Sequence, residues 1–223
     1  MCSEMRLAVA AVVALILSGC GNDQDRIDFV ALSKSIVSQV GGAGSAEGQQ
    51  AIAAPADVLA QVSGPVIIGL ARDGTEPFYL IGVRDNGPYR TYVTGTRQTM
   101  TFRQGVVTAT RGTRNDLMSS DIDRTLALLR SGQEGRAQRV MHYLDGEDQT
   151  IDLVLDCVIK AGLSAPSGAA LAALPGRKMT EDCTSPRVSF SNSYHMDATG
   201  RVIASVQWLS VRTGPVLFQE LRQ

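Results

Sequence analysis

The sequence predicts a mainly β protein with antiparallel sheets in a sandwich or barrel, an N-terminal helix and one or two short additional helices. Two observations lead to this fold class. Short runs rich in β-branched and apolar residues follow one another closely, with turn sequences and no helix between most of them. Few stretches space their apolar residues three or four positions apart, as one face of a helix requires. Closely spaced strands without crossover helices favour antiparallel pairing.

An amphipathic helix is predicted over residues 22–40. Phe29, Leu32, Ile36 and Val40 fall three or four positions apart and therefore share one helix face. The small and polar residues that follow predict a flexible connection to the first strand.

A second helix is predicted over residues 118–130, with Ser119 or Ser120 as its N-cap. A short third helix is expected over 169–174, inside a loop rich in Ala, Gly, Pro and Ser. The apolar residues that give the second helix its face are Ile122, Leu126 and Leu129.

Ten strands are predicted around these helices, most of them separated by turn sequences such as Asp-Asn-Gly-Pro and Arg-Gln-Gly. The strand that ends near Cys157 alternates apolar and polar residues, so Ile151, Leu153, Leu155 and Cys157 should all point inward. The predicted strands are 66–71, 78–84, 89–94, 99–102, 106–110, 137–144, 150–159, 188–196, 201–210 and 216–221.

The N-terminus has the pattern of an export signal. Arg6 precedes an uninterrupted apolar run over residues 7–17, which is too short to span a bilayer. The run ends in Leu17-Ser18-Gly19-Cys20, which resembles a bacterial lipobox, so Cys20 is expected to be acylated, with palmitate among its acyl chains, and to become the first residue of the mature chain. Two or more acyl chains give stable membrane anchoring.

This pattern predicts the domain organisation and the location. Residues 1–19 form a lipoprotein signal peptide, 20–64 a lipidated N-terminus with helix and linker, and 65–223 a β-rich domain that could divide into two subdomains near residue 132. Gly21 replaces the Asp that retains similar lipoproteins in the inner membrane. We therefore expect a lipid-anchored protein of the outer membrane that faces the periplasm. Either Met1 or Met5 fits as the start of the signal.

Cys157 and Cys183 are the cysteines that remain in the body of the mature chain. An even pair in an oxidising compartment predicts a disulfide. The bridge would close a loop of about 27 residues and contribute about 3–4 kcal/mol in the chain-entropy model. A metal site or a reactive thiol is the alternative, but the two cysteines lack Cys-x-x-Cys spacing and a nearby histidine.

Composition excludes several classes of partner. The formal net charge of −1 argues against a nucleic-acid partner, which calls for a basic face. A mean hydropathy of +0.02 is too low for a protein with several membrane spans.

Two stretches, together with the lipobox, resemble the YjbF family of envelope lipoproteins, also called the GfcB family. The first contains Gly105, the segment Thr110-Arg111-Gly112 and then Asp116-Leu117; the second contains Ser205, Gln207 and Trp208. The sequence departs from the family pattern in lacking a Trp before the first hairpin and in the position of Pro215. The resemblance implies a β-rich lipoprotein encoded beside exopolysaccharide or capsule secretion genes, without established catalysis.

Arg111, Asp116 and Trp208 are the candidate binding residues. For Arg111 and Asp116 we expect a structural ion pair that fixes the turn after the hairpin, ahead of a binding role. Trp208 is expected to pack in the core. The alternative is that it forms a sugar-stacking face with four tyrosines, which are Tyr79, Tyr89, Tyr92 and Tyr194.

Residues typical of catalysis or metal binding are sparse. His142 and His195 are expected to be partly exposed strand residues, because neither has the spacing of a metal ligand. Asp121 and Asp123 are better explained as acids at a helix start than as a pair for glycoside cleavage. We predict no catalytic residues, no metal and no cofactor.

The leading hypothesis is an outer-membrane lipoprotein that assists capsule or exopolysaccharide export or assembly. It would act without catalysis, by binding the polymer or a protein of the export machinery. The alternatives are a periplasmic carbohydrate-active enzyme and a purely structural envelope lipoprotein.

Overall fold

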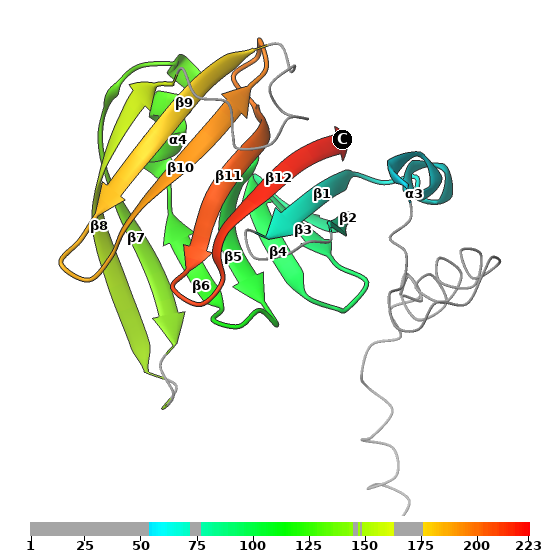
Figure 1. The fold of residues 1–223 in the computed structure, drawn as a ribbon, viewed down its shortest axis with the longest axis horizontal. Helices are drawn as coiled ribbons and strands as arrows, with labels where there is room; N and C mark the ends of the chain where they lie inside the picture. Colours follow the sequence, from blue (N-terminus) through cyan, green and yellow to red (C-terminus); the bar gives the residue numbers. More distant parts are fainter. Residues whose placement is uncertain (1–53, 72–76, 145–146, 148, 163–175) are drawn as a thin grey trace, which may run out of the picture.

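Twelve antiparallel strands form one continuous sheet in the computed structural model, which describes residues 54–71, 77–144, 147, 149–162 and 176–223 (Figure 1). The strands follow one another around the sheet in sequence order, and β1 pairs with β12 to join the first strand to the last. The bounds are β1 Val66–Ala71, β2 Phe78–Asn86, β3 Tyr89–Val93, β4 Thr99–Arg103, β5 Val106–Arg111, β6 Leu117–Asp121, β7 Gly135–Leu144, β8 Thr150–Ala161, β9 Arg177–Thr184, β10 Ser189–Met196, β11 Val202–Ser210 and β12 Gly214–Arg222.

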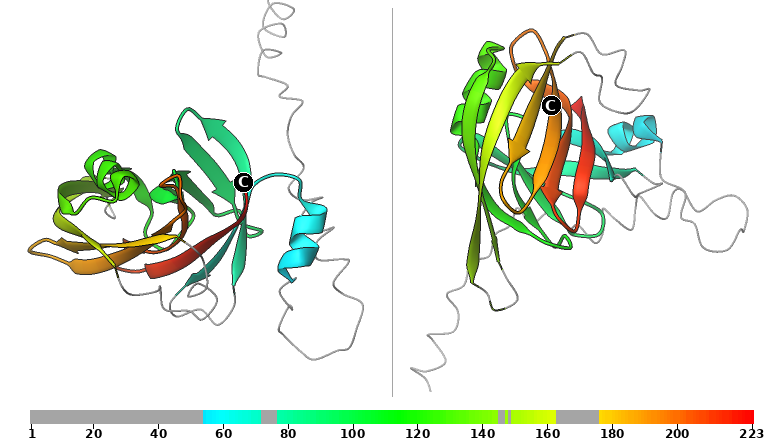
Figure 2. Two further views of the ribbon diagram at one scale, coloured as in Figure 1. Left: turned by 90° about the horizontal axis from the view of Figure 1, so that it is seen from above. Right: turned by 60° about the vertical axis from the view of Figure 1, so that its left-hand side comes forward.

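The sheet curls into a nearly closed barrel, as the view from above shows (Figure 2). The two strands at the ends of the sheet order are β5 and β6, which are consecutive in the sequence. The barrel therefore has one seam, between β5 and β6. This architecture confirms the predicted mainly β, antiparallel class with short additional helices.

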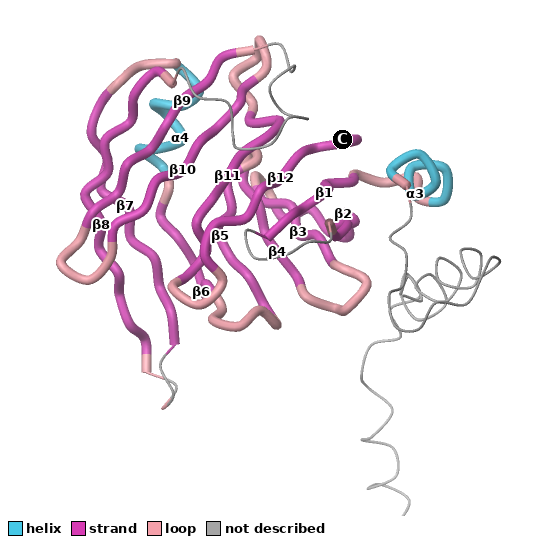
Figure 3. Tube along the Cα trace, viewed as in Figure 1, coloured by secondary structure: helices cyan, strands magenta, loops and turns pink. Residues whose placement is uncertain are grey.

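The up-and-down order gives the barrel two distinct ends. Connections that follow odd-numbered strands lie at one end, which we call the loop end. Its described turns are 94–98, 112–116, 185–188 and 211–213. Connections that follow even-numbered strands lie at the opposite end, which we call the helix end because α4 (Asp123–Ser131) belongs to it (Figure 3).

The barrel interior is filled by one hydrophobic core. Tyr92, Phe102 and Phe218 meet edge to face there, with ring centroids 5.4 and 5.2 Å apart. Gly105 lies against the backbone of Val202, where a Cβ would come within 2.4 Å of the Val202 carbonyl oxygen. The β4–β5 hairpin thus folds onto the start of β11.

A short helix, α3 (Pro55–Gln61), packs outside the barrel beside the C-terminal strand (Figure 1). Pro55 begins it, because the fixed φ of proline suits the first helical position. Val58 and Val62 form a small apolar cluster with Val66 of β1. The Arg222 guanidinium donates to the carbonyl oxygens of Leu59, Val62 and Gly64 and so holds the C-terminal end of α3.

The predicted helix over 118–130 is wrong in its first part. Residues 117–121 form strand β6, and Ser119 and Ser120 pair with His142 and Met141 of β7 instead of capping a helix. Helix α4 starts at Asp123, and the Asp121 carboxylate accepts a hydrogen bond from the backbone N–H of Asp123. Partner strand β7 decides this boundary, because a Ser-Ser-Asp segment has no strong preference for either state.

Three elements are additional to those predicted from the sequence. They are helix α3, strand β6 and strand β9, which lies between β8 and β10. The predicted helices over 22–40 and 169–174 lie outside the described residues. Ile151 was expected to point inward but is 37% exposed, because it lies near the turn of the β7–β8 hairpin, away from the core.

Candidate functional site

A buried ion pair lies inside the barrel. Arg139 of β7 and Glu181 of β9 are 1% and 0% exposed, with 2.9 Å between Nη1 and Oε2. Three neutral donors also form hydrogen bonds to the Glu181 carboxylate, at 2.7–2.9 Å. They are the Thr125 hydroxyl of α4, the Asn192 amide of β10 and the Tyr194 hydroxyl of β10.

The protonation states match this arrangement. Burial, with the Glu181 carboxylate close by, raises the pKa of Tyr194 well above its ordinary value, so the hydroxyl remains a donor. Burial lowers the pKa of Arg139, but the charge of Glu181 outweighs it and the net pKa is raised. Arg139 thus remains a positively charged partner for Glu181.

The hydrogen bonds of this cluster indicate a structural role and not a catalytic one. Glu181 accepts hydrogen bonds from four side chains of α4, β7 and β10, and its buried carboxylate has no face open to a substrate. A charge removed from water is stable only when its hydrogen-bonding capacity is filled in this way. The cluster thereby fixes α4 and three strands relative to one another.

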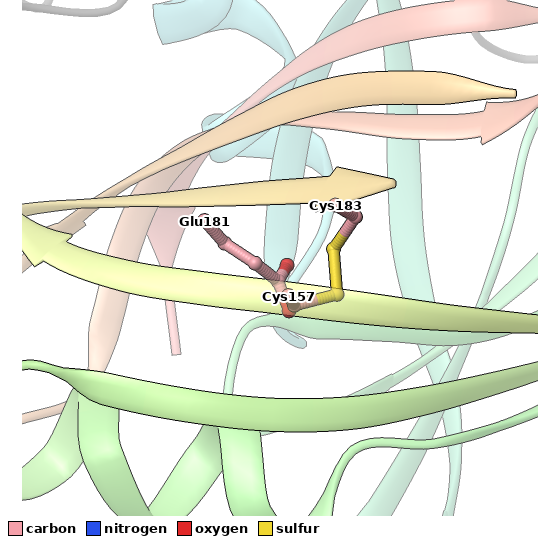
Figure 4. A group of neighbouring side chains, drawn as sticks. All are labelled: Cys157, Glu181 and Cys183. Carbon is pink, nitrogen blue, oxygen red and sulfur yellow. A yellow bond between two sulfur atoms is a disulfide. The ribbon is translucent and has the colours of Figure 1, made fainter. Parts of the chain in front are cut away.

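A disulfide joins Cys157 of β8 to Cys183 of β9, at positions directly opposite each other in the ladder. Figure 4 shows the Glu181 carboxylate beside this bridge, on the same face of the sheet. Two cysteines and a carboxylate could form part of a metal site, and their ligand atoms lie within 4.8 Å of one another. The oxidised sulfur atoms offer no thiolate and Glu181 is saturated, so this group does not fit a metal ion.

Side chains also satisfy the free edge of β5 at the seam. The backbone N–H of Val107 donates to the Gln207 side-chain oxygen at 2.9 Å, and the Gln207 amide donates to the Gly105 carbonyl at 2.9 Å. Arg139 reaches the Val107 carbonyl at 3.4 Å. β11 and β7 thus supply, through side chains, hydrogen bonds that a neighbouring strand would supply in a closed sheet.

Arg111 and Asp116 form no ion pair with each other, contrary to the expectation from sequence. Arg111 donates to the carbonyl oxygens of Thr110, Leu117 and Met118 and so bridges the loop-end edge of the seam. Asp116 accepts from the backbone N–H groups of Gly112 and Thr113 at 2.8 Å, and from two threonine hydroxyls. Backbone groups compete successfully for both side chains, because the tight turn points several of them inward. Both residues stabilise the β5–β6 connection.

Trp208 packs in the core, as one of the two interpretations of the sequence predicts. Its ring stacks on Phe190 at 4.4 Å with 6° between the planes, and it is 8% exposed. The four tyrosines do not join it in an exposed aromatic face. Tyr92 and Tyr194 are buried in the main core, and Tyr89 is exposed.

The two histidines differ in exposure. His142 lies on the outer face of β7, 2.6 Å from the Asp152 carboxylate of β8. His195 was expected to be partly exposed but is fully buried. The register places it opposite Ala204, and the ring lies beside Gly176, where an added Cβ would come within 3.1 Å of Nε2.

Asp121 and Asp123 are both exposed. Asp123 lies in the first turn of α4, as expected of an acid at a helix start, and it pairs with Arg103 at the helix end. The Asp121 carboxylate is engaged by the backbone at the start of the same helix.

A small, half-open pocket lies under the β4–β5 hairpin. It measures about 40 Å³ and is lined by Tyr92, Phe102, Phe218 and Glu220, among others. Burial raises the pKa of Glu220 above its usual range, partly offset by Arg201. Ligand pockets begin near roughly 300 Å³, so this space suits a water molecule and not a sugar.

Sequence reasoning missed the Arg139–Glu181 pair. Every second residue of β7 faces the core, and these residues are Ala137, Arg139, Met141 and Tyr143. This period of two could have placed Arg139 on the core face from sequence alone. The inward position of Glu181 could not be predicted in this way, because strand β9 itself was not predicted.

The sequence matches a family model described as group 4 capsule polysaccharide lipoprotein GfcB, YjbF, over residues 27–221. The chain belongs to this family. Among solved structures, the barrel is similar to the crystal structure of the hypothetical lipoprotein YmcC from Escherichia coli K12. The TM-score is 0.60 at 16% identity, and the match covers 75% of this chain and 88% of the other. No curated protein matches the sequence.

Membership makes this YjbF-family chain one of a group of capsule polysaccharide lipoproteins. The family is not one of known enzymes. Among the described residues, no helix is long and apolar enough to cross a membrane.

Proposed function

We propose that this YjbF-family protein is acylated at Cys20 after removal of residues 1–19 and assists capsule or exopolysaccharide export without catalysis. It is held at the outer membrane, faces the periplasm, and binds the polymer or a protein of the export machinery. The family match over residues 27–221 is the observation that carries this proposal. The lipobox at Leu17-Ser18-Gly19-Cys20 supports the anchor.

The structure of the interior supports a non-catalytic role. The buried carboxylate, Glu181, is saturated by hydrogen bonds, and the small pocket beside Glu220 cannot admit a sugar ring. A glycosidase needs two carboxyl groups about 5–10 Å apart in an open cleft. Asp121 and Asp123 at the helix end do not form such a pair, because one is bound to the backbone and the other to Arg103.

Deletion and complementation test the role in export. A strain that lacks the gene should lose surface polysaccharide, and the wild-type gene should restore it. The Cys20→Ser variant should restore little, because the chain would lack its anchor. Unchanged surface polysaccharide in the deletion strain would overturn the proposed function.

Metabolic labelling with radioactive palmitate tests the anchor separately. The wild-type chain should incorporate label and the Cys20→Ser chain should not. Equal labelling of both would refute acylation at Cys20. Fractionation of the membranes on a sucrose gradient then tests the location, and recovery in the inner membrane would contradict it.

A further inference from the structure

Four turns at the loop end share one construction, and each carries an arginine. Arg97, Arg114, Arg187 and Arg212 lie in the turns 94–98, 112–116, 185–188 and 211–213, respectively, and all four are exposed. Among the described residues, none of the four guanidinium groups takes part in a hydrogen bond or an ion pair. We call these four segments the arginine turns.

Side-chain hydrogen bonds fix the backbone of the first two arginine turns. In the turn of Arg97, the Thr94 hydroxyl accepts from the backbone N–H of Gln98 at 3.1 Å. In the turn of Arg114, the Asp116 carboxylate accepts two backbone N–H groups at 2.8 Å. Each arginine therefore projects from a backbone that is already ordered.

The other two arginine turns are fixed in the same way. The Ser185 hydroxyl accepts from the backbone N–H groups of Arg187 and Val188 at 3.3 and 3.1 Å. The Ser210 hydroxyl accepts from the backbone N–H of Thr213 at 3.0 Å, across Arg212. An ordered turn reduces the entropy that is lost when its side chain binds a ligand.

Arg97 has an unfavourable backbone conformation. Its φ is +67°, in the left-handed region where glycine or asparagine is preferred. Gln104 in the β4–β5 turn shares this conformation, with a φ of +52°, so the geometry of a tight hairpin turn accounts for it. The inference therefore depends on the exposure of the four arginines and on their guanidinium groups, which bond to none of the described residues.

Five arginines at the helix end are used differently, because they are engaged by carboxylates or by carbonyl oxygens and so contribute to the fold. Other arginines at that end are exposed on the surface. The carboxylate pairs are Arg90 with Asp85, Arg103 with Asp123, and Arg201 with Asp197 and Glu220, and the carbonyl pairs are Arg177 with Leu129 and Arg130, and Arg222 with the end of α3.

We propose that the four arginine turns bind the carboxylate groups of an acidic polysaccharide that lies across the loop end of the barrel. The inference rests on the proposed function and names the class of polymer and the residues that contact it. Guanidinium groups bind carboxylates through paired hydrogen bonds, and four of them on separate turns match charges that recur along a polymer.

Local contacts, and not bulk charge, carry this binding. The whole chain has a net charge of −1, and the described acids toward the loop end are Asp116, Glu147, Asp152, Asp156 and Asp182. Asp182 accepts from the Ser191 hydroxyl and pairs with Lys160, while Asp156 is exposed on β8. Asp116 is engaged by its turn and Asp152 pairs with His142, so neither competes directly for the four arginines. The chain enters the barrel from α3 at the opposite end (Figure 1).

Binding to polygalacturonate, a polymer of carboxylate-bearing sugars, tests the proposal. The protein is the mature chain from residue 20 with Ser in place of Cys20, which retains every described residue and needs no detergent. We expect calorimetry to detect binding to polygalacturonate and not to neutral dextran. Replacing the four arginines by glutamine should weaken the affinity at least about tenfold at low salt.

A matched variant controls for the change in net charge. Arg84, Arg124, Arg130 and Arg136 are exposed and lie toward the helix end, and replacing these four by glutamine removes the same charge. This variant should bind polygalacturonate like the parent. Equal loss in both variants, or no loss in the arginine-turn variant, would overturn the proposal.

A vesicle assay and complementation separate the other outcomes. If the arginine turns mediate sedimentation with vesicles of phosphatidylglycerol and phosphatidylethanolamine but not binding to polygalacturonate, the partner is a membrane surface and the proposal is wrong. If the arginine-turn variant fully restores surface polysaccharide in the deletion strain, this inference fails while the proposed function stands. If the deletion itself changes nothing, the proposed function fails and the binding data still decide the inference.

Discussion

Replacing Arg139 by methionine should destabilise the barrel severely. The change removes the positive partner of Glu181 and leaves a carboxylate that is 0% exposed with only neutral donors. Breaking a buried ion pair by removing one partner costs about 3–5 kcal/mol. Arg139 also binds Ser120 and the Val107 carbonyl, so the same change removes two contacts that secure β6 and the edge of β5.

Urea denaturation followed by fluorescence measures this loss. Trp208 is the sole tryptophan of the chain and is buried against Phe190, so its emission reports on the folded core. A cost of about 3–5 kcal/mol corresponds to a fall in Tm on the order of 10 °C for a domain of this size.

Two further variants make the test specific. Arg136→Met changes an exposed arginine on the same strand and should shift stability by no more than about 0.5 kcal/mol. The double variant Arg139→Met/Glu181→Leu removes both charges and should be more stable than Arg139→Met alone, because no unpaired charge stays buried. An Arg139→Met protein within about 1 kcal/mol of wild type would show that the buried pair does not hold the barrel together.

Three further predictions concern the disulfide, the β5–β6 turn and α3. The Cys157→Ala/Cys183→Ala variant should lose about 3–4 kcal/mol in urea denaturation, and a stability equal to wild type would contradict the loop-closure account. Burial raises the pKa of Asp116, but hydrogen bonds from its turn outweigh this effect, and the net pKa lies below the usual 3.8. The ionised Asp116 side chain therefore stabilises the fold above about pH 4, and this stabilisation is lost as the pH falls through the lowered pKa. Asp116→Asn should therefore be less stable than wild type at pH 7, with a difference that shrinks on acidification, and a constant difference from pH 7 to 3 in thermal melts would be inconsistent. Arg222→Met should release α3 and speed proteolytic cleavage within residues 55–64, whereas the exposed control Arg84→Met should not; equal cleavage rates in the two variants would show that Arg222 does not hold the helix.

Most strands follow from local sequence, and the exceptions have a physical cause. Strands such as β4, β5 and β11 are bounded by turn residues and carry β-branched or apolar runs, so composition suffices to predict them. Strand β9 places Glu181 on its inward face between Met179 and Cys183, which breaks the expected alternation. An inward carboxylate is tolerated only because donors from other elements meet it.

Among the candidate site residues, too, local sequence predicts the partners of some and not of others. The pairing of Cys157 with Cys183 was predictable because few other cysteines are present, and those lie in or beside the predicted signal peptide. The partners of Arg111 and Asp116 were not, because they are backbone groups whose directions depend on the fold of the turn. That the guanidinium groups of the four arginine turns bond to none of the described residues also became visible only in three dimensions.

Local pattern and residue identity are enough to predict the antiparallel β class, the candidate lipidation site at Cys20 and the resemblance to a lipoprotein family. How the barrel closes is visible only in the folded chain, where Arg139, held by Glu181, acts with Gln207 and Arg111 at a seam without a complete ladder. The folded chain also brings four arginines from distant parts of the sequence to one end. Both features depend on contacts between residues far apart in sequence, which hydrophobic period and turn composition do not encode.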